Sequence, residues 1–153
     1  MKRFAWFFMV ALAVFLLGAC ANGASDSEGA RQNLIAFFDF LNRGQYDEAA
    51  ELYGGGYEIL VDFNPALDPE NCPALLKNGC EINGLQCLTV LTAEFKEKNS
   101  KGEYVFLVQF KDANGNLFVQ QTPNAPPVFI FEYRVMKGED GTIRVLDLPP
   151  YVH

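Results

Sequence analysis

The side chains best suited to chemistry in this chain are four cysteines, Cys20, Cys72, Cys80 and Cys87, and a single histidine, His153. No two cysteines have the Cys-x-x-Cys spacing that redox catalysis and many zinc sites use, and the histidine ends the chain. A Ser-His-Asp or Cys-His relay would have to recruit that terminal residue, and the sequence contains no Gly-x-Ser-x-Gly motif. We therefore expect no metal site, no other cofactor and no nucleophilic catalysis of the usual kind.

Cys20 follows a segment with the three-part plan of an export signal. Lys2 and Arg3 form a short positive lead, residues 4–17 are an uninterrupted apolar run, and small residues precede the cysteine. A helix of 14 residues rises roughly 21 Å, less than the roughly 30 Å hydrocarbon core of a bilayer. A retained membrane span is the structural alternative, because the small residues that follow lengthen the apolar stretch.

The tetrapeptide Leu17-Gly18-Ala19-Cys20 resembles the lipobox of bacterial lipoproteins. The resemblance implies that residues 1–19 are a signal peptide, that diacylglycerol is joined to the Cys20 sulfur, and that the new amino terminus is acylated. The chain would then be anchored on the extracytoplasmic side of the cell envelope. Because Ala21 and not Asp follows, the resemblance favours the outer membrane in a diderm cell; in a monoderm cell it implies the outer face of the cell membrane.

Residues 20–28 are small and polar after the cysteine, a composition that predicts a flexible tether, and residues 29–153 form one domain. Within the domain, Ser25 with Glu28 forms a capping box for a helix that ends at Gly44. A second helix stops at the three glycines of residues 54–56. A strand over residues 57–61 and a third helix from Asp68-Pro69 to Asn78-Gly79 follow.

The pattern turns to antiparallel β structure from residue 85 to residue 148. Four breaks divide this region into five strands, at residues 99–102, 112–116, 122–127 and 138–141. The segments 104–110 and 128–135 carry bulky apolar residues on both faces. Strands of this kind are usually central and covered on both sides, by helices on one face and by a second subunit on the other.

The order of elements, together with the segment FFDFLNRGQYDEAA at residues 37–50, resembles the nuclear-transport-factor-like, or SnoaL-like, cone fold. In that fold a curved sheet wraps a long first helix and leaves a pocket at its open end. The expected class is α+β, with two helices, a strand, a helix and then a curved antiparallel sheet. The resemblance leaves the function open, because this fold hosts isomerases, dehydratases and plain binding modules.

Cys80 and Cys87 flank Asn83-Gly84, a tight-turn signal that can bring the two thiols within range of each other. Cys72 and Cys80 are separated by about 12 Å of helix rise, beyond the limit of about 7 Å between bridged α-carbons. An exported chain meets an oxidising environment, so we expect a disulfide between Cys80 and Cys87. We interpret Cys72 as a small buried hydrophobe, with a free exposed thiol or an intermolecular disulfide as alternatives.

Catalysis by a carboxylate side chain is the enzymatic hypothesis that remains. Alternation places Glu132 and Arg134 on one face of the strand expected at residues 128–135, and Gln109 on the face of Leu107. If that face lines a pocket, Glu132 would be a base and Gln109 a polar group in apolar surroundings, as in isomerases of this fold. The alternative, which we favour, is that Glu132 and Arg134 pair across solvent at the end of a sheet.

Twelve basic against 19 acidic residues give a net charge of −7, which argues against nucleic acid as a partner. The many aromatic residues and the lack of a competent catalytic set favour a lipid-anchored, non-catalytic domain that binds a small apolar ligand or an envelope protein. The alternatives are an isomerase- or dehydratase-like enzyme that uses Glu132, and a module that forms a homodimer through its sheet.

Overall fold

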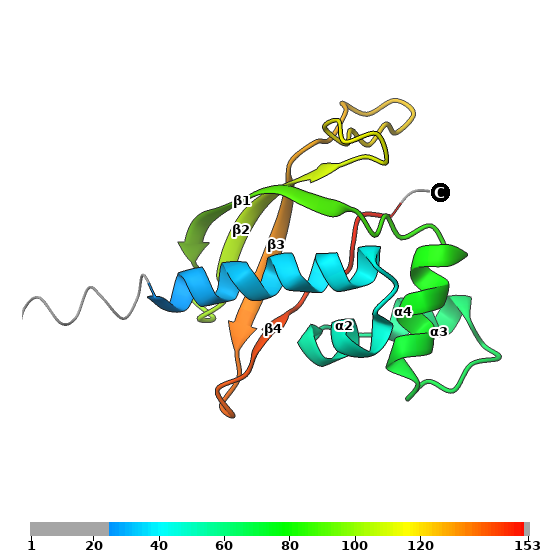
Figure 1. Cartoon of the computed structure of the whole chain (residues 1–153), viewed down its shortest axis with the longest axis horizontal. Coiled ribbons are helices and arrows are strands. Elements are labelled where there is room, and N and C mark those ends of the chain that lie inside the picture. Colours follow the sequence, from blue (N-terminus) through cyan, green and yellow to red (C-terminus); the bar gives the residue numbers. More distant parts are fainter. Residues whose placement is uncertain (1–24, 152–153) are drawn as a thin grey trace, which may run out of the picture.

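The computed structural model describes residues 25–151. The predicted signal peptide, Cys20 and His153 lie outside the described residues. The chain is helical over residues 25–42, and this first helix lies across one face of an antiparallel sheet (Figure 1). Residues 25–28, which the sequence assigned to the tether, are therefore helical. The carboxylate of Glu28 accepts hydrogen bonds from Arg31 and Gln32, so it faces the next turn of the helix and not the predicted capping box.

The first helix ends as the sequence predicts. Gly44 adopts a positive φ of 73°, and its N–H bonds to the carbonyl of Leu41 at 3.1 Å. The N–H of Gln45 reaches back to the carbonyl of Phe40 at 2.9 Å, which completes a Schellman motif. Helix α2 (Tyr46–Leu52) then begins at once, in agreement with the second predicted helix.

The strand predicted at residues 57–61 is wrong, because this segment forms the short helix α3 (Glu58–Phe63). The alternation that suggested a strand placed Ile59 inside, whereas Ile59 is 50% exposed and Leu60 is buried. The nearby sheet edge offers little pairing, since the carbonyl of Val145 on β4 (Ile143–Val145) already accepts the N–H of Gly54. With few strand hydrogen bonds within reach, a single helical turn satisfies the backbone locally.

Helix α4 (Cys72–Glu81) is the third predicted helix with shifted ends. It begins four residues after Asp68, where the side chain of Asn71 accepts the N–H of Ala74 at 3.2 Å. It also continues through Gly79, the residue that was expected to end it. Glycine is required there for packing, because a β-carbon on Gly79 would lie 2.7 Å from the side chain of Leu85.

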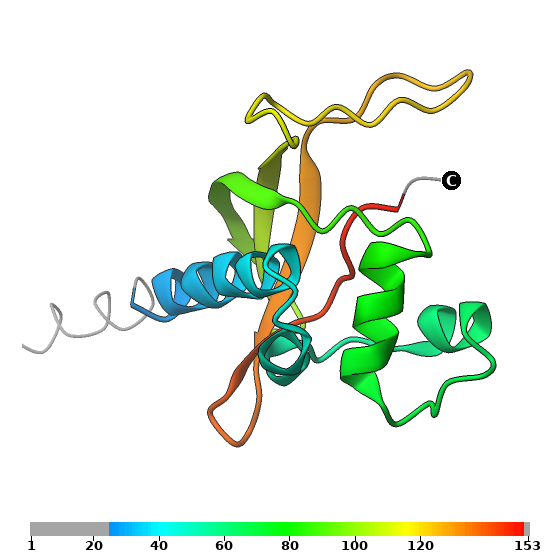
Figure 2. The same ribbon diagram turned by 45° about the vertical axis from the view of Figure 1, so that its right-hand side comes forward.

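The sheet has four antiparallel strands in the order β1 (Thr89–Lys98), β2 (Tyr104–Lys111), β3 (Phe131–Lys137) and β4. With the helices this gives the expected α+β class. The fifth predicted strand is absent from the sheet, because residues 117–121 make only two isolated bridges, Lys111 to Leu117 and Gln120 to Val128. The strand predicted from residue 128 starts at Phe131, because Val128 makes only the isolated bridge to Gln120. Residues 117–130 project from the body (Figure 2).

The core lies between the first helix and the sheet. Phe37 and Phe38 have no exposed surface, and the ring of Phe38 packs edge-on against Phe110 and Tyr133 at centroid distances of 4.8 and 5.0 Å. Tyr53 from the end of α2 stacks on Phe37 at 5.7 Å. These rings fill the space between the first helix and the inner side of the sheet.

The predicted disulfide between Cys80 and Cys87 is confirmed, with α-carbons 5.6 Å apart. The turn between the two cysteines is also as expected, since Gly84 adopts a φ of 87°. The bridged loop makes two further contacts: Asn42 of the first helix donates to the carbonyl of Cys87, and the N–H of Gln86 donates to the carbonyl of Pro150. The loop therefore joins the first helix, α4 and the C-terminal segment.

We predict that Gly79→Ala destabilises the protein by about 1–3 kcal/mol although alanine is the better helix former, because the added methyl group overpacks against Leu85. Gly29→Ala is the matched control, since a β-carbon there meets only Ile143 at an ordinary 3.6 Å. We expect that change to stabilise by about 0.5–1 kcal/mol. Urea denaturation followed by circular dichroism gives both values, and equal stabilisation by the two changes would contradict the packing argument.

Candidate functional site

Glu132 and Gln109 lie on the face of the sheet that the first helix does not cover. Glu132 is opposite Leu107 in the register, and its carboxylate bonds to Lys96 at 2.6 Å with half of its side chain exposed. Gln109 accepts a hydrogen bond from Thr92 at 3.1 Å. A shallow hollow of about 90 Å³ includes Gln109 but not Glu132. The two predicted residues therefore share a face without sharing an enclosed site.

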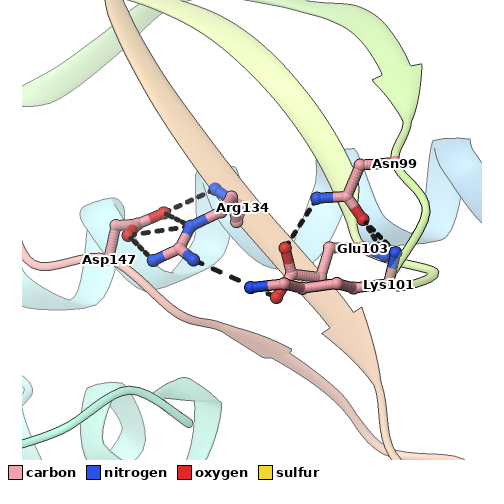
Figure 3. Close-up of polar contacts among 5 residues, drawn as sticks. All are labelled: Asn99, Lys101, Glu103, Arg134 and Asp147. Carbon is pink, nitrogen blue, oxygen red and sulfur yellow. Dashed lines mark hydrogen bonds and ion pairs between the residues drawn. The ribbon is translucent and has the colours of Figure 1, made fainter.

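The pairing expected between Glu132 and Arg134 is wrong. Arg134 stands on the same face but turns to the segment after β4, where its guanidinium donates to both carboxylate oxygens of Asp147 at 2.5–3.2 Å. The backbone N–H of Arg134 also donates to Asp147, at 2.7 Å (Figure 3). Asp147 can satisfy three donors of Arg134 at once, and Glu132 is left to the nearer cation, Lys96.

Glu103 is the buried carboxylate that the sequence analysis missed. Its residue is only 7% exposed, it lies 4.0 Å from the guanidinium of Arg134, and it accepts a 2.7 Å hydrogen bond from the amide of Asn99. The same Asn99 side chain accepts the backbone N–H groups of Lys101 and Glu103 and so closes the turn between β1 and β2 (Figure 3). The sequence signal that could have pointed to this cluster is an asparagine at the start of a turn that contains glycine.

The polar cluster of Asn99, Glu103, Arg134 and Asp147 joins the turn between β1 and β2, strand β3 and the segment after β4, and we interpret it as structural. Its carboxylates are engaged by cations or amides. The hydrogen bond to Asp147 and its negative charge raise the pKa of Arg134. On the inner face, burial and the negative charge of Asp147 raise the pKa of Tyr53 well above its usual value. The polar groups of the cluster are thus paired mainly with one another.

Cys72 is free and half-buried at the start of α4. Its thiol lies beside the buried hydroxyl of Tyr57, whose pKa is raised by burial and also by this cysteine. This environment agrees with the interpretation of Cys72 as a packing residue.

A broad, open groove of about 580 Å³ lies between the first helix, α2 and the hairpin of β3 and β4. It has the volume of a small-molecule site, but it is not enclosed and its lining includes the charged side chains of Glu51 and Arg144. Arg144 is already paired with Asp140 at 3.2 Å. The lining also includes the apolar side chains of Leu52 and Ile143, so it is of mixed character.

A second hollow, which we call the apolar hollow, has a volume of about 100 Å³. It is bounded by α3, the disulfide loop and the C-terminal segment, and its lining is Ile59, Leu60, Phe63, Leu85, Leu148, Pro149 and Tyr151. Phe63 stacks on Tyr151 at 5.8 Å, and Leu85 pairs with Tyr151 through a β-bridge. The lining contains no charged residue.

Residues 117–130, which we call the apolar arm, extend from the ends of β2 and β3 (Figure 2). They lie within the longest uncharged run of residues 25–151: no charged residue occurs between Asp112 and Glu132, 19 positions in a chain that is 20% charged. Five large apolar side chains of the arm are 38–46% exposed, those of Leu117, Val119, Val128, Phe129 and Ile130. Exposed apolar residues gathered without charges are typical of an interaction surface.

The arm and the hollow are neighbours. The side chain of Gln120 on the arm donates to the carbonyl of Tyr151 at 2.8 Å, and Tyr151 also lines the hollow. In the two views, the arm and helices α3 and α4 lie toward the same end of the molecule (Figures 1 and 2). We call the arm and the hollow together the apolar end, and it is the candidate binding site.

Within the part of the chain that the structure describes, no three histidine, cysteine, aspartate or glutamate side chains are grouped to hold a metal ion. In the same range, no helix is both long and apolar enough to cross a bilayer. No known protein family, no curated protein and no solved structure matches this chain.

We predict that Asp147→Ala lowers the free energy of unfolding by about 2 kcal/mol, because it removes a charged acceptor of several hydrogen bonds from Arg134. Glu132→Ala is the control on the same strand, and we expect a loss of about 1 kcal/mol or less because its pair with Lys96 is exposed. Chemical denaturation measures both. Equal losses would show that the cluster around Arg134 is no more important than a surface ion pair.

Proposed function

We propose that this protein is a lipid-anchored, extracytoplasmic binding domain without catalytic activity, and that it binds an envelope protein through its apolar end. The observation that carries the proposal is the uncharged arm, with five exposed apolar side chains, beside a preformed apolar hollow. The lipid anchor and the extracytoplasmic location are proposed from the export signal and the lipobox-like sequence at Cys20. The first helix across a curved sheet supports the likeness to the cone fold.

The dimensions of the apolar end favour a protein over a small apolar ligand. Pockets for small molecules have volumes of roughly 300–1,000 Å³ and bury most of their ligand. The apolar hollow, at about 100 Å³, is of a size for one side chain of a partner. A projecting arm adds contact area outside the hollow, which a protein surface can use and a small ligand cannot.

The alternative function, an enzyme that uses Glu132, has less support. That carboxylate is exposed and paired with Lys96. A base in an isomerase of this fold would need an apolar enclosure that excludes water. Glu132 does not line the hollow beside Gln109, and half of its side chain is exposed to solvent.

We predict that a photo-crosslinking amino acid at Val128 in the full chain captures one discrete protein adduct in the native membranes. The same amino acid at Ile82 is the control, because Ile82 is 72% exposed but does not line the hollow. In the triple variant V128S/F129S/I130S, cross-linking from Leu117 should fall at least tenfold, since the substitutions remove most of the apolar contact area. Identical adducts from positions 128 and 82 would argue against the apolar end as the binding site.

The anchor makes a separate prediction. Cys20→Ser should remove the acyl mass from the mature protein and move it from the membrane to the soluble fraction, because serine offers no thiol for lipid attachment. Intact-mass spectrometry and membrane fractionation measure the two effects. Cys72→Ser is the matched control and should change neither. If the Cys20→Ser protein keeps its mass and stays in the membrane fraction, the proposed lipid anchor is wrong. Residues 4–17 would then be explained as a retained membrane span.

A further inference from the structure

We propose that the partner at the apolar end is a second copy of this chain, and that the arm of each copy lies across the apolar hollow of the other. This inference rests on the proposed function and names the occupant of the same site. It differs from the expected homodimer through the sheet, since it uses the arm and the C-terminal hollow.

The relative positions of the two surfaces suit a two-fold dimer. In such a dimer, the arm of the first subunit contacts the hollow of the second, and the hollow of the first contacts the arm of the second. The arm and the hollow are adjacent through the contact of Gln120 with Tyr151. A single axis beside this residue would therefore bring both arms onto both hollows at once.

Shape and charge also fit. The hollow has room for one apolar side chain, and Val128, Phe129 and Ile130 on the arm are three consecutive candidates, each more than 40% exposed. Both surfaces are uncharged, whereas the whole chain carries a net charge of −7. Two copies of an acidic chain repel each other, and the repulsion is smallest where neither copy presents a carboxylate.

The apolar area reaches the minimum for a specific interface. With roughly 150–200 Å² of surface per large apolar side chain, the five residues of the arm, together with Ile59 and Phe63, expose about 500 Å² in each copy. If all of this surface were covered, two copies would bury about 1,000 Å², the minimum expected of a specific interface and within the range of weak complexes. Backbone and proline surface of the arm would add to this area.

The structure disfavours association by strand pairing. The free edge of β1 is interrupted by two irregularities in its register with β2 and carries Glu94, Lys96, Glu97 and Lys98, features that block edge-to-edge contact. The tip of the arm contains Pro123, Pro126 and Pro127, which lack the N–H groups that a new strand would need. Side-chain contact between arm and hollow does not depend on such pairing.

The test uses full-length chains in their native membranes, with Cys72→Ser in each to leave no free thiol among the described residues. One tagged copy carries Phe129→Cys and a differently tagged copy carries Ile59→Cys, and a short bis-maleimide joins thiols that lie close together. We expect a covalent dimer that contains both tags, at least fivefold more abundant than with Ile82→Cys in place of Ile59→Cys. As a control for folding, each variant is extracted with detergent, and its sedimentation should match that of the wild-type protein.

Three results would overturn the inference. No mixed-tag product above the Ile82→Cys control means that the arm does not meet the hollow of a second copy. If Phe129→Cys is instead joined to a different protein, the second copy is wrong while the proposed function stands. If maleimide labelling of Phe129→Cys in purified protein is suppressed by phosphatidylcholine vesicles and no protein adduct forms, a lipid surface occupies the arm and both proposals fail.

Discussion

The filling of the space between the first helix and the sheet constrains the rest of the molecule. Phe37 and Phe38 are completely buried there, and the ring of Phe38 contacts aromatic rings from β2 and β3. Close-packed rings of this size stabilise the domain, and they also occupy the volume that an internal ligand would need. The proposed binding site accordingly uses the exterior, where the apolar surface of this chain is on an arm and in a shallow hollow.

The disulfide loop gives the exterior site its fixed shape. The bridge between Cys80 and Cys87 holds Leu85 in position over Gly79, so close that the helix can accept only glycine there. Leu85 in turn pairs with Tyr151, whose ring stacks on Phe63. Three segments that are distant in sequence thus form one apolar wall, so the proposed binding of a partner would need little ordering of this wall.

Features fixed by a few adjacent residues could be predicted from the sequence, and features fixed by a distant partner could not. Gly44 ends its helix and Gly84 turns the disulfide loop by local backbone preference alone. The segment at residues 57–61 has an alternating pattern, but its conformation depends on the packing of Leu60 and on a sheet edge with little room for another strand. The role of Glu132 likewise depended on which sheet face the first helix covers. The uncharged arm could have been found by its missing charges, but not its position beside the hollow.

The proposed anchor and the proposed dimer support each other physically. An interface of about 1,000 Å² is at the lower limit for a specific complex, and two acidic copies free in solution would associate weakly through it. Lipid chains on Cys20 would confine the copies to one membrane and limit their orientations, which raises the effective concentration of one apolar end near another. A surface too small to form a stable complex in dilute solution can then be occupied most of the time. An uncharged arm that would be an aggregation hazard on a freely diffusing protein becomes tolerable when the membrane limits the orientations in which copies meet.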